Sequence, residues 1–488
     1  MKDNLHALFD PENIAIVGVS PNPLKAGYII LSNLISIGYP KKVFPISPKE
    51  ESILGFPCHK KLSQVEDTVE LVVLITPSEL IDEIMEDLEV RMAAKNDVKV
   101  IVCAAANYGE IKTEEGQRRQ DCLINTAKKY GIRVLGPNCI GVIDNINRVD
   151  TTFVETMLPK ETRGKKGGIS FISQSGSMAA SILMKGASQP APISINKFVS
   201  IGNMADVDFI DLLEYFEEDE DTRVIGMYIE GYAEGKRLIE TMARIVRKKP
   251  IVVLKVGRSA VGAEAANSHT GSLAGSDEVY SAAFRQFGVI RTYSMQELID
   301  NLQAFDSLPL PQGNRVFILT QTGGFGIYST DAVLEQRTLQ MPVVSAETKE
   351  LLRSVVPEMS SICSPEGYSD ITVSANVRQH VDALRVVLGD KNVDSVIFLT
   401  VVPSFLPRKE LAEALIRFLK EENQGRKPVY ICILSGNYVW ECRAILEGSG
   451  VKTFEEPSNA VSALKNMVEY SMFLQNLKGG EWFEQISE

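Results

Sequence analysis

His269 lies in a run of small residues, from Asn267 to Ser276, and its side chain has the clearest capacity for chemistry in the chain. Imidazole is a good nucleophile toward phosphorus near neutral pH, because a pKa of about 6.5 leaves one ring nitrogen unprotonated. The stretch 257–276 holds four glycines, many alanines and serines, and two charged residues. Such a segment forms little core and its glycines can act as hinges, so it predicts a mobile arm that carries one reactive group. For a lone histidine in an arbitrary loop, a solvated side chain without a task is the more common alternative.

Two matching turns follow apolar strands in different parts of the chain. Residues 172–179 read I-S-Q-S-G-S-M-A, and residues 319–326 read L-T-Q-T-G-G-F-G. A strand, a turn rich in hydroxyls and glycine, and then a helix place free backbone N–H groups and the positive end of a helix dipole at one point. Either turn alone could be a tight strand-to-helix connection with a helix cap. As a pair, they predict two phosphate-binding turns, made by Ser175, Gly176, Ser177, Thr322, Gly323 and Gly324.

Glu230 ends an apolar strand expected over residues 224–229. It therefore falls at the carboxyl edge of a sheet, where α/β proteins place their ligands. A carboxylate there can accept the N–H of one imidazole nitrogen, so that the other nitrogen stays free to attack. The alternative is an ordinary charge at a strand end.

The first strand-to-helix turn, at Gly18 and Ser20, is of the kind that holds a phosphate ligand, although it lacks the G-x-G-x-x-G pattern. The second strand is followed by Lys49, where a dinucleotide-binding fold would place an acid for the ribose hydroxyl. A cation there suits a nucleotide with a phosphate on its ribose, and both coenzyme A and NADP fit; a solvated lysine is the alternative. The predicted cofactor-binding residues are Gly18, Ser20, Lys25, Lys49, Thr76 and Asn138.

The composition excludes several classes of protein. A net charge of -12 argues against a nucleic-acid or anionic-membrane partner, because either would need a basic surface. The seven cysteines show no C-x-x-C spacing, which favours a reducing compartment over a disulfide or zinc framework. The N-terminus lacks a signal-peptide pattern, and no run of about 18 apolar residues occurs. We expect a cytoplasmic protein.

Short β-branched runs alternate with helical patterns, which is typical of parallel sheets built from strand–helix–strand units. A chain of 488 residues has room for about three domains, and we expect them at 1–142, 143–307 and 308–488. The expected strands are 14–17, 42–46, 69–75, 98–104, 132–135, 169–172, 224–229, 251–255, 316–319, 395–402 and 429–434. The expected helices of the third domain are 376–388, 409–421 and 458–476.

Other residues with chemical potential give no predicted site. His380 lies in a helical stretch, His59 precedes two lysines in a loop, and His6 is in the N-terminal tail. No histidine or cysteine cluster has metal-ligand spacing, and Ser175 lacks the G-x-S-x-G pattern of a serine nucleophile. The acidic run 217–221 is expected to be a solvated turn after a helix.

Taken together, these motifs resemble the α-subunit of succinyl-CoA synthetase, and more closely the α-subunit of ADP-forming acyl-CoA (acetate–CoA) ligases. The resemblance covers residues 10–300 well and the third domain more loosely. The residues that carry it are Gly18 to Ser20, Gly136 to Cys139, Ser173 to Gly176, Phe209 to Phe216, Glu230 and Ser268 to Gly271.

The resemblance implies a Rossmann-like CoA-binding domain followed by two flavodoxin-like domains. It also implies a reversible reaction in which acyl-CoA and phosphate give an acyl phosphate, His269 takes the phosphoryl group, and ADP receives it to make ATP. Glu230 is then the partner of the histidine, and the two turn helices face the phosphohistidine from different domains. Fixed dipoles and an in-line nucleophile are what phosphoryl transfer requires of a protein.

The chain lacks a G-x-x-x-x-G-K-[ST] loop, and three domains leave no room for a nucleotide-grasping module. The resemblance therefore implies a separate β-subunit with an ATP-grasp module that holds ATP or ADP and Mg²⁺, in an α2β2 heterotetramer. The arm would carry phosphate between the sites. The turn at 364–370 departs from the pattern of relatives, so a role for Asp370 stays open.

Two other functions stay open: a CoA-sensing or phosphocarrier protein without turnover, and an NADP-dependent oxidoreductase. The carboxylic acid, the physiological direction and the choice of ADP over GDP are not encoded in any motif.

Overall fold

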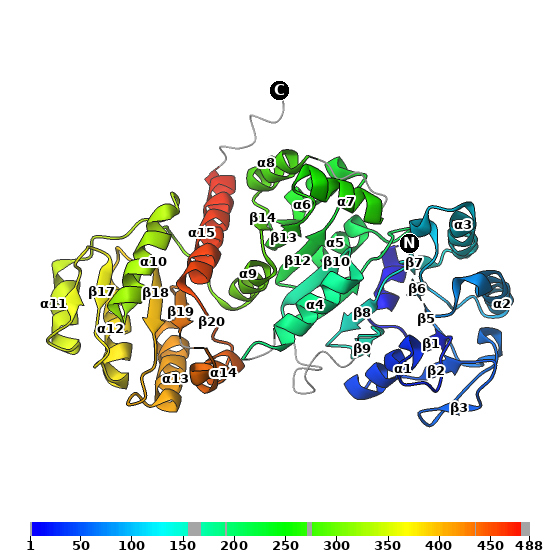
Figure 1. Ribbon diagram of the computed structural model, residues 1–488, viewed down its shortest axis with the longest axis horizontal. Coiled ribbons are helices and arrows are strands. Elements are labelled where there is room, and N and C mark those ends of the chain that lie inside the picture. The colour runs from blue at the N-terminus through cyan, green and yellow to red at the C-terminus, as the bar shows by residue number, and fades with distance from the viewer. Residues whose placement is uncertain (1, 155–166, 191–192, 271–275, 435, 480–488) are drawn as a thin grey trace. The chain divides into compact units, whose positions relative to one another are not determined.

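The computed structural model describes residues 2–154, 167–190, 193–270, 276–434 and 436–479. These residues form two compact units, and the boundary between the units lies between Tyr293 and Ser294 (Figure 1). Within the described residues, no helix combines the length and the apolar character needed to cross a bilayer. Each unit is built from sheets whose strands alternate with helices, as the sequence predicts.

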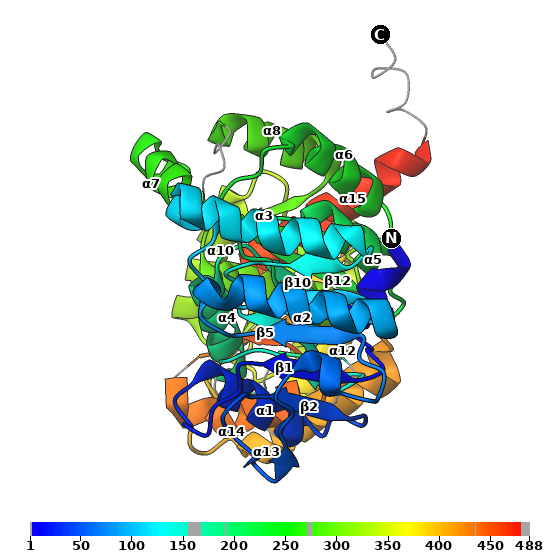
Figure 2. The ribbon, with the colours of Figure 1, turned by 90° about the vertical axis from the view of Figure 1, so that its right-hand side faces the viewer.

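The first unit begins with a five-stranded parallel sheet in the order β2-β1-β5-β6-β7. Its strands fall where the sequence predicts them, because buried parallel strands are continuous apolar runs. Helices α2 and α3 contact each other and lie side by side in Figure 2. The bounds are β1 (Ile14–Val17), β2 (Val43–Ile46), β5 (Leu71–Leu74), β6 (Val100–Cys103), β7 (Arg133–Leu135), α1 (Ala26–Ile37), α2 (Ile81–Ala94) and α3 (Glu114–Lys129).

A second, seven-stranded sheet completes this unit, in the order β14-β13-β12-β10-β11-β8-β9. Five strands are parallel, but β8 pairs antiparallel with β11 and β9 antiparallel with β8, so the sheet is mixed at this edge. The strands are β8 (Gly141–Asp144), β9 (Val149–Asp150), β10 (Ile169–Ser173), β11 (Ile195–Ser200), β12 (Val224–Ile229), β13 (Ile251–Lys255) and β14 (Ile290–Thr292). The helices are α4 (Gly176–Ala187), α5 (Phe209–Glu218), α6 (Gly235–Ile245), α7 (Ala260–Thr270) and α8 (Asp277–Phe287).

Two segments of this unit make contacts that their local sequence does not predict. His6, near the N-terminus, lies in a 3-10 helix (Lys2–Leu8), and its Nδ1 is 3.3 Å from the hydroxyl of Tyr215. The acidic run is not simply solvated, because the Glu217 carboxylate is buried at the end of α5 and pairs with Arg244 and Lys248. In both places, contacts between distant residues decide the structure.

The second unit holds a six-stranded sheet in the order β16-β17-β15-β18-β19-β20. Five of its strands repeat the arrangement of five strands in the second sheet. If each set of five is numbered from 1 to 5 in chain order, both sets are arranged 5-4-3-1-2; the sets are β10 to β14 and β15, β17, β18, β19 and β20. The strands are β15 (Val316–Thr320), β16 (Ser361–Ile362), β17 (Tyr368–Asp370), β18 (Ser395–Thr400), β19 (Val429–Ile433) and β20 (Thr453–Phe454). The helices are α9 (Met295–Ser307), α10 (Gly323–Glu335), α11 (Ala346–Val355), α12 (Val377–Gly389), α13 (Arg408–Arg417), α14 (Trp440–Gly448) and α15 (Pro457–Gly479).

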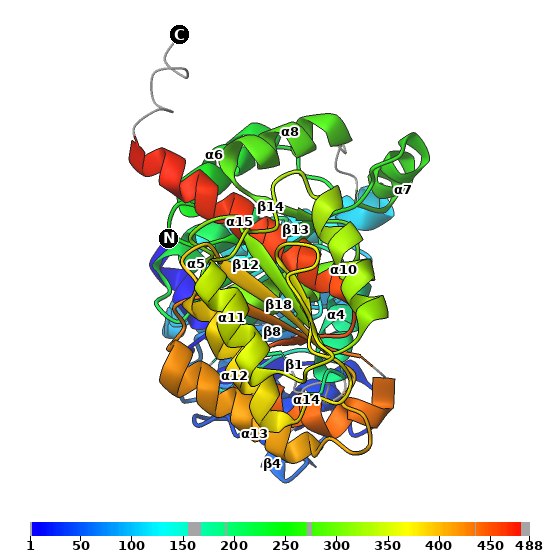
Figure 3. The same cartoon turned by 90° about the vertical axis from the view of Figure 1, so that its left-hand side faces the viewer.

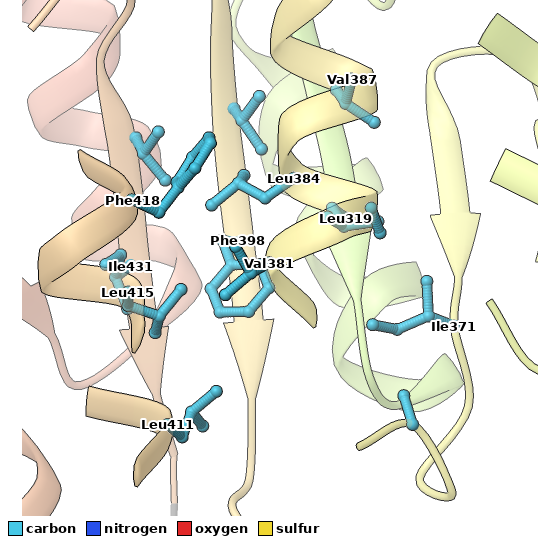
Figure 4. Packing of buried hydrophobic residues seen from close by; sticks show 14 of the residues in the cluster. Leu319, Ile371, Val381, Leu384, Val387, Phe398, Leu411, Leu415, Phe418 and Ile431 are labelled. Carbon is cyan, nitrogen blue, oxygen red and sulfur yellow. The ribbon is translucent and has the colours of Figure 1, made fainter. Parts of the chain in front are cut away.

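Helices cover both faces of this sheet, with α12 and α13 on one side and α10 and α15 on the other (Figures 1 and 3). Helix α9 also belongs to this unit and packs on α15, where Asn466 Nδ2 donates to Asn301 Oδ1 at 2.8 Å. Side chains of α12 and α13 meet those of the central strands in one apolar core, in which Leu384 and Leu415 pack with Phe398 (Figure 4). The three-domain division of the chain stays a prediction.

His380 is fully buried in α12 at this core. Its Nδ1 lies 2.8 Å from the carbonyl oxygen of Asn376, its ring packs edge-on against Phe398, and its Nε2 has no hydrogen-bond partner among the described residues. Burial lowers the pKa of His380 from 6.5 to about 4. Between these two pH values His380 is therefore mostly protonated in the unfolded chain and mostly neutral in the native state.

This histidine predicts an acid sensitivity of the second unit. Between pH 6.5 and about 4 the unfolded state binds more protons than the native state, so stability falls as the pH drops. We expect the group to remove roughly 3 kcal/mol from the free energy of unfolding by about pH 4. Both tryptophans, Trp440 and Trp482, follow residue 294, so urea unfolding monitored by tryptophan fluorescence measures this unit. His380→Gln should lose most of the pH dependence; an unchanged profile in the variant would contradict the assignment.

Candidate functional site

The carboxyl edge of the first sheet brings Gly18 and Thr76 together. Gly18 follows β1 with φ +104, and a Cβ built on it would lie 2.8 Å from Thr76 Cγ2 and 2.9 Å from the carbonyl oxygen of Ile75. A Cβ on Gly27 would lie 2.7 Å from the carbonyl oxygen of Gly18, so α1 also packs closely against this turn. Glycine is therefore required at both positions, because any side chain would collide with the segment directly after β5 or with the turn itself.

The other predicted cofactor-binding residues lie at the same edge of the sheet. Ser20 follows Gly18 in the turn, and its hydroxyl accepts a hydrogen bond from the Asn22 N–H at 3.3 Å. Lys25 immediately precedes α1 and Lys49 follows β2, and both are exposed, so their ammonium groups are accessible to an anionic ligand. Asn138 follows β7 with φ +58, and its exposed side chain donates through Nδ2 to Asn203 Oδ1 at 3.4 Å, in the segment that follows β11 of the second sheet.

The first predicted phosphate-binding turn is held rigidly between β10 and α4. The Ser173 hydroxyl donates to the carbonyl oxygen of Ser175 at 2.8 Å. Gln174 is buried, and its side-chain oxygen accepts the N–H groups of Glu230 at 2.8 Å and Gly231 at 3.2 Å, while its Nε2 donates to the carbonyl oxygen of Gly231 at 3.0 Å. One glutamine therefore fixes the turn to the end of β12. At the start of α4, the hydroxyls of Ser175 and Ser177 lie 3.3 Å apart.

The second turn repeats these contacts in the second unit. The Thr320 hydroxyl donates to the carbonyl oxygen of Thr322 at 2.8 Å, as Ser173 does in the first turn. The buried Gln321 accepts the hydroxyl of Thr400 at 2.6 Å and the N–H of Val401 at 3.4 Å. The two segments that the sequence pairs thus have the same topology and share the hydroxyl contact, and each glutamine oxygen accepts the N–H that follows the neighbouring strand. The glutamine amide groups differ, since Gln174 donates to Gly231 and Gln321 donates to Val373.

The two turns differ in their charged groups. Val401 occupies the place in the second unit that Glu230 occupies in the first, directly after the strand held by the glutamine. A carboxylate oxygen of Asp370 lies 3.2 Å from the position of a Cβ on Gly323, beside the start of α10. The second turn therefore has its carboxylate on strand β17, whereas the first has Glu230 after β12. The Thr322 hydroxyl is buried and has no hydrogen-bond partner in the described parts of the chain.

The glutamines allow a paired test of the first turn. Gln174→Leu leaves two buried N–H groups unpaired at the end of β12, so we expect a loss of about 2–3 kcal/mol in stability. If the resemblance holds and acyl-CoA and phosphate phosphorylate His269, this variant should also slow that step at least about 10-fold, because the backbone of Glu230 is no longer held in place. The matched variant Gln321→Leu should lose similar stability and keep that rate. Equal effects of both variants on the rate, measured by rapid quench, would contradict a specific role for the first turn.

Glu230 is buried directly after β12. The Tyr228 hydroxyl hydrogen-bonds its carboxylate; burial, followed by the charge of Glu230 and this hydrogen bond, raises the pKa of Tyr228 above its ordinary value. Lys255, at the end of β13, is almost completely buried, and its ammonium donates to the carbonyl oxygens of Glu230, at 2.9 Å, and Val256. Burial lowers the pKa of Lys255. The ends of two neighbouring strands are therefore tied together beneath the carboxylate.

His269 lies in α7 (Ala260–Thr270), so the predicted arm over 257–276 contains a helix, and the mobility of this arm stays a prediction. Alanine has the highest helix propensity, and between Ala260 and Thr270 only Gly262 interrupts an alanine-rich run. The side chain of His269 and residues 271–275 lie outside the described part of the structure. A short connection that includes Gly257 joins the end of β13 at Lys255 to the start of this helix at Ala260.

A cavity of about 520 Å³ opens beside the start of α4, within the first unit. It brings together Asn138 from the edge of the first sheet and the turn of the second sheet. Its floor is made by two loops bonded backbone to backbone, where Asn203 N–H donates to the Pro137 carbonyl at 2.9 Å. The lining residues are Ala104, Asn138, Cys139, Ile140, Phe153, Val154, Gln174, Ser175, Gly176, Ser177, Ala180, Gly202, Asn203 and Met204.

Sequence reasoning missed several of these residues. Lys255 ends an expected strand and Gln174 lies inside a recognised motif. The local sequence around each residue does not show which backbone groups its side chain will bind. Phe153 and Met204 are apolar residues in connecting segments, and nothing in the pattern places them at one cavity. Among the described residues, no cluster of three histidine, cysteine or acidic side chains could hold a metal ion.

Comparisons with known proteins identify two matching family models. Residues 12–145 match a CoA binding domain, and residues 166–305 match a succinyl-CoA ligase like flavodoxin domain. The predicted fold class is confirmed, and the CoA-binding match favours coenzyme A over NADP at the first sheet.

Full-length relatives give the same result. The chain is 36% identical to the "Acetate–CoA ligase [ADP-forming] II subunit alpha" of Pyrococcus furiosus, over 98% of this chain and 99% of that one. It is 33% identical to the "Acetate–CoA ligase [ADP-forming]" of Methanocaldococcus jannaschii, over 98% of this chain and 65% of that longer one. Among solved structures, the "dinucleotide forming Acetyl-coenzyme A synthetase 1 in complex with phosphate and ADP" of Ca. Korarchaeum cryptofilum matches with a TM-score of 0.87 and 32% identity, over 99% of both chains.

Proposed function

Because this chain belongs to the family of ADP-forming acetate–CoA ligases and matches their α-subunits over nearly its whole length, we propose that it forms and transfers a phosphoryl group through His269. The chain is an acid–thiol ligase subunit of the ADP-forming kind. In the direction of ATP synthesis, a phosphate oxygen attacks the thioester carbonyl and CoA thiolate leaves, which gives an acyl phosphate. An imidazole nitrogen of His269 then attacks phosphorus and the carboxylate leaves. The terminal oxygen of ADP finally takes the phosphoryl group and restores the imidazole.

The cavity beside α4 is the observation that carries this proposal. It joins a predicted cofactor-binding residue, Asn138, with a predicted phosphate-binding turn, Ser175 to Ser177, in one space. Backbone N–H groups and the helix dipole at the start of α4 favour an anion there and stabilise charge that develops during phosphoryl transfer. The acyl phosphate would therefore form where the two sheets of the first unit meet.

Glu230 and its neighbours position the histidine in this proposal. The carboxylate would accept the N–H of one ring nitrogen of His269, and the Tyr228 hydroxyl would hold that carboxylate in turn. Gln174 and Lys255 hold the backbone of Glu230 from two neighbouring strands. The second turn, at Thr322 to Gly324, would serve a later stage of the transfer. Coenzyme A would bind at the edge of the first sheet, with its phosphates near Gly18, Ser20, Lys25, Lys49 and Thr76.

The acceptor nucleotide belongs to a partner subunit in this proposal. Relatives that match end to end are named as α-subunits, whereas the chain spans 65% of a single-chain relative, whose additional length leaves room for a nucleotide-binding module. We assign that module, of the ATP-grasp type with Mg²⁺ and ADP or ATP, to a β-subunit in an α2β2 heterotetramer.

The proposal is tested by incubating the purified chain, with and without the matching β-subunit, with acetyl-CoA and labelled phosphate. Covalent label that is labile in acid and stable in base supports the phosphohistidine; no label with any acyl-CoA would favour a CoA-sensing or phosphocarrier protein. A thermal-shift comparison of CoA with NADP separates the oxidoreductase alternative, since only CoA is expected to protect the chain.

A further inference from the structure

Among the residues that the structure describes, those that line the cavity beside α4 carry no charged side chain. Its described lining consists of amide and hydroxyl groups, small residues, and the apolar side chains of Ile140, Phe153, Val154 and Met204. Phe153, Val154 and Met204 are each only partly buried, so apolar surface faces the cavity and a ligand with an apolar part would cover it.

Ile140 lies directly beside the phosphate-binding turn. Its Cγ2 is 3.0 Å from the position of a Cβ on Gly176, the first residue of α4. Its backbone is fixed, because its N–H donates to the Ser200 hydroxyl at 3.3 Å. In an acyl phosphate, one bridging oxygen separates the phosphorus from the acyl carbon. A phosphoryl group at the start of α4 therefore brings the acyl group against Ile140 and the side chains next to it.

Met204 enters the cavity from a backbone that is held in an unusual conformation. Its φ is +55, which is uncommon for a residue with a side chain. The flanking residues hold it there: the N–H of Asn203 donates to the carbonyl of Pro137 at 2.9 Å and the N–H of Ala205 to that of Gly136 at 3.1 Å. Strained backbone of this kind persists where surrounding contacts impose it and is concentrated at ligand sites.

The backbone on either side of Phe153 is held by a side chain of α1. The buried Asn33 of α1 donates through Nδ2 to the carbonyl oxygens of Thr152, at 2.8 Å, and Val154, at 3.2 Å. The residue between these two carbonyls is Phe153. The aromatic ring and the flexible methionine thus start from fixed backbone positions.

We propose that Ile140, Phe153 and Met204 bind the acyl tail of the substrate, that the tail is uncharged and apolar, and that Met204 limits its size. This inference rests on the proposed function. A tail that carries a second carboxylate would be taken from water without a cation to pair with it in the described lining. Methionine is unbranched and adaptable, so it fills the space beside a small tail and leaves that space when truncated.

The test measures kcat/KM of the complex with the β-subunit for acetyl-CoA, isobutyryl-CoA, phenylacetyl-CoA and succinyl-CoA. For the wild type, succinyl-CoA should be at least about 100-fold poorer than isobutyryl-CoA. Met204→Ala should raise the ratio of phenylacetyl-CoA to acetyl-CoA at least about 10-fold, because it removes three heavy atoms from the lining. Met204→Leu, which keeps the volume, should leave the ratio within about 3-fold of the wild type.

Met184→Ala is the matched control, since Met184 lies on α4, is 51% exposed and does not line the cavity. It should leave every ratio unchanged. Two results would overturn this inference alone, provided that the complex turns over acetyl-CoA. One is an unchanged ratio of phenylacetyl-CoA to acetyl-CoA in Met204→Ala, and the other is a wild-type kcat/KM for succinyl-CoA as high as that for isobutyryl-CoA. A complex that turns over no acyl-CoA would overturn the proposed function together with it.

Discussion

Replacing His269 by alanine is expected to abolish ATP synthesis from acyl-CoA, with kcat lower by at least about 10³-fold, because the nucleophile that receives the phosphoryl group is removed. The fold should be unaffected, since α7 is an alanine-rich helix in which alanine is the best helix former. The measurement is steady-state release of CoA thiol by the reconstituted complex with acetyl-CoA, ADP and phosphate.

His6→Ala is the matched control, because His6 is an exposed histidine of the same unit, whose ring contacts Tyr215. It should keep at least about half of the wild-type rate, as expected for a surface substitution. Activity in His269→Ala close to that of this control would show that the phosphoryl group does not pass through residue 269.

Glu230→Gln is expected to slow phosphorylation of the chain by about 10²-fold while CoA affinity stays near normal. The amide keeps the size of the side chain but loses the negative charge that would orient the imidazole and stabilise its positive form. The Tyr228 hydroxyl can still donate to the amide oxygen, so the local packing should persist. The measurement is a rapid-quench time course of label incorporation, together with CoA binding by calorimetry.

Glu234→Gln serves as the matched control. Glu234 directly precedes α6, is exposed, and pairs with Arg237 at 3.2 Å, four residues beyond Glu230. It should change neither the phosphorylation rate nor CoA affinity. If Glu230→Gln lowers CoA affinity as much as it lowers the rate, the carboxylate is structural and its assigned role is wrong.

Strands made of uninterrupted apolar residues were predictable from the sequence. Strands β12 and β13 begin and end at the predicted residues, because strands covered on both faces are mostly continuous apolar runs. Strand β11 was missed because Asn196 and Lys197 interrupt its apolar run. Both are buried, and Lys197 pairs with Asp219 at 3.0 Å and Asp144 at 3.4 Å. Such compensation comes from residues far away in the chain, so no local pattern contains it.

The candidate site divides in the same way. The paired turns and Glu230 were predictable because hydroxyls, glycines and a carboxylate at strand ends have local signatures. The role of Gln174 was not, since the N–H groups that it binds belong to residues 56 and 57 positions later. Helix α7 within the predicted arm was not expected, because the glycines indicate a loop whereas the alanines between them favour a helix. The assembly of the cavity depends on two loops, near Asn138 and Met204, that only the folded chain brings together.

The most direct test of the account is to count covalent phosphate on the chain before and after ADP is added. Wild-type complex mixed with acetyl-CoA and labelled phosphate, quenched in base and digested, should yield one labelled peptide, with the phosphate on the imidazole of His269 and a stoichiometry approaching one per chain. The label should appear before ATP and leave the peptide when ADP is added. ATP formed at the normal rate with no phosphate ever found on that histidine would contradict the account.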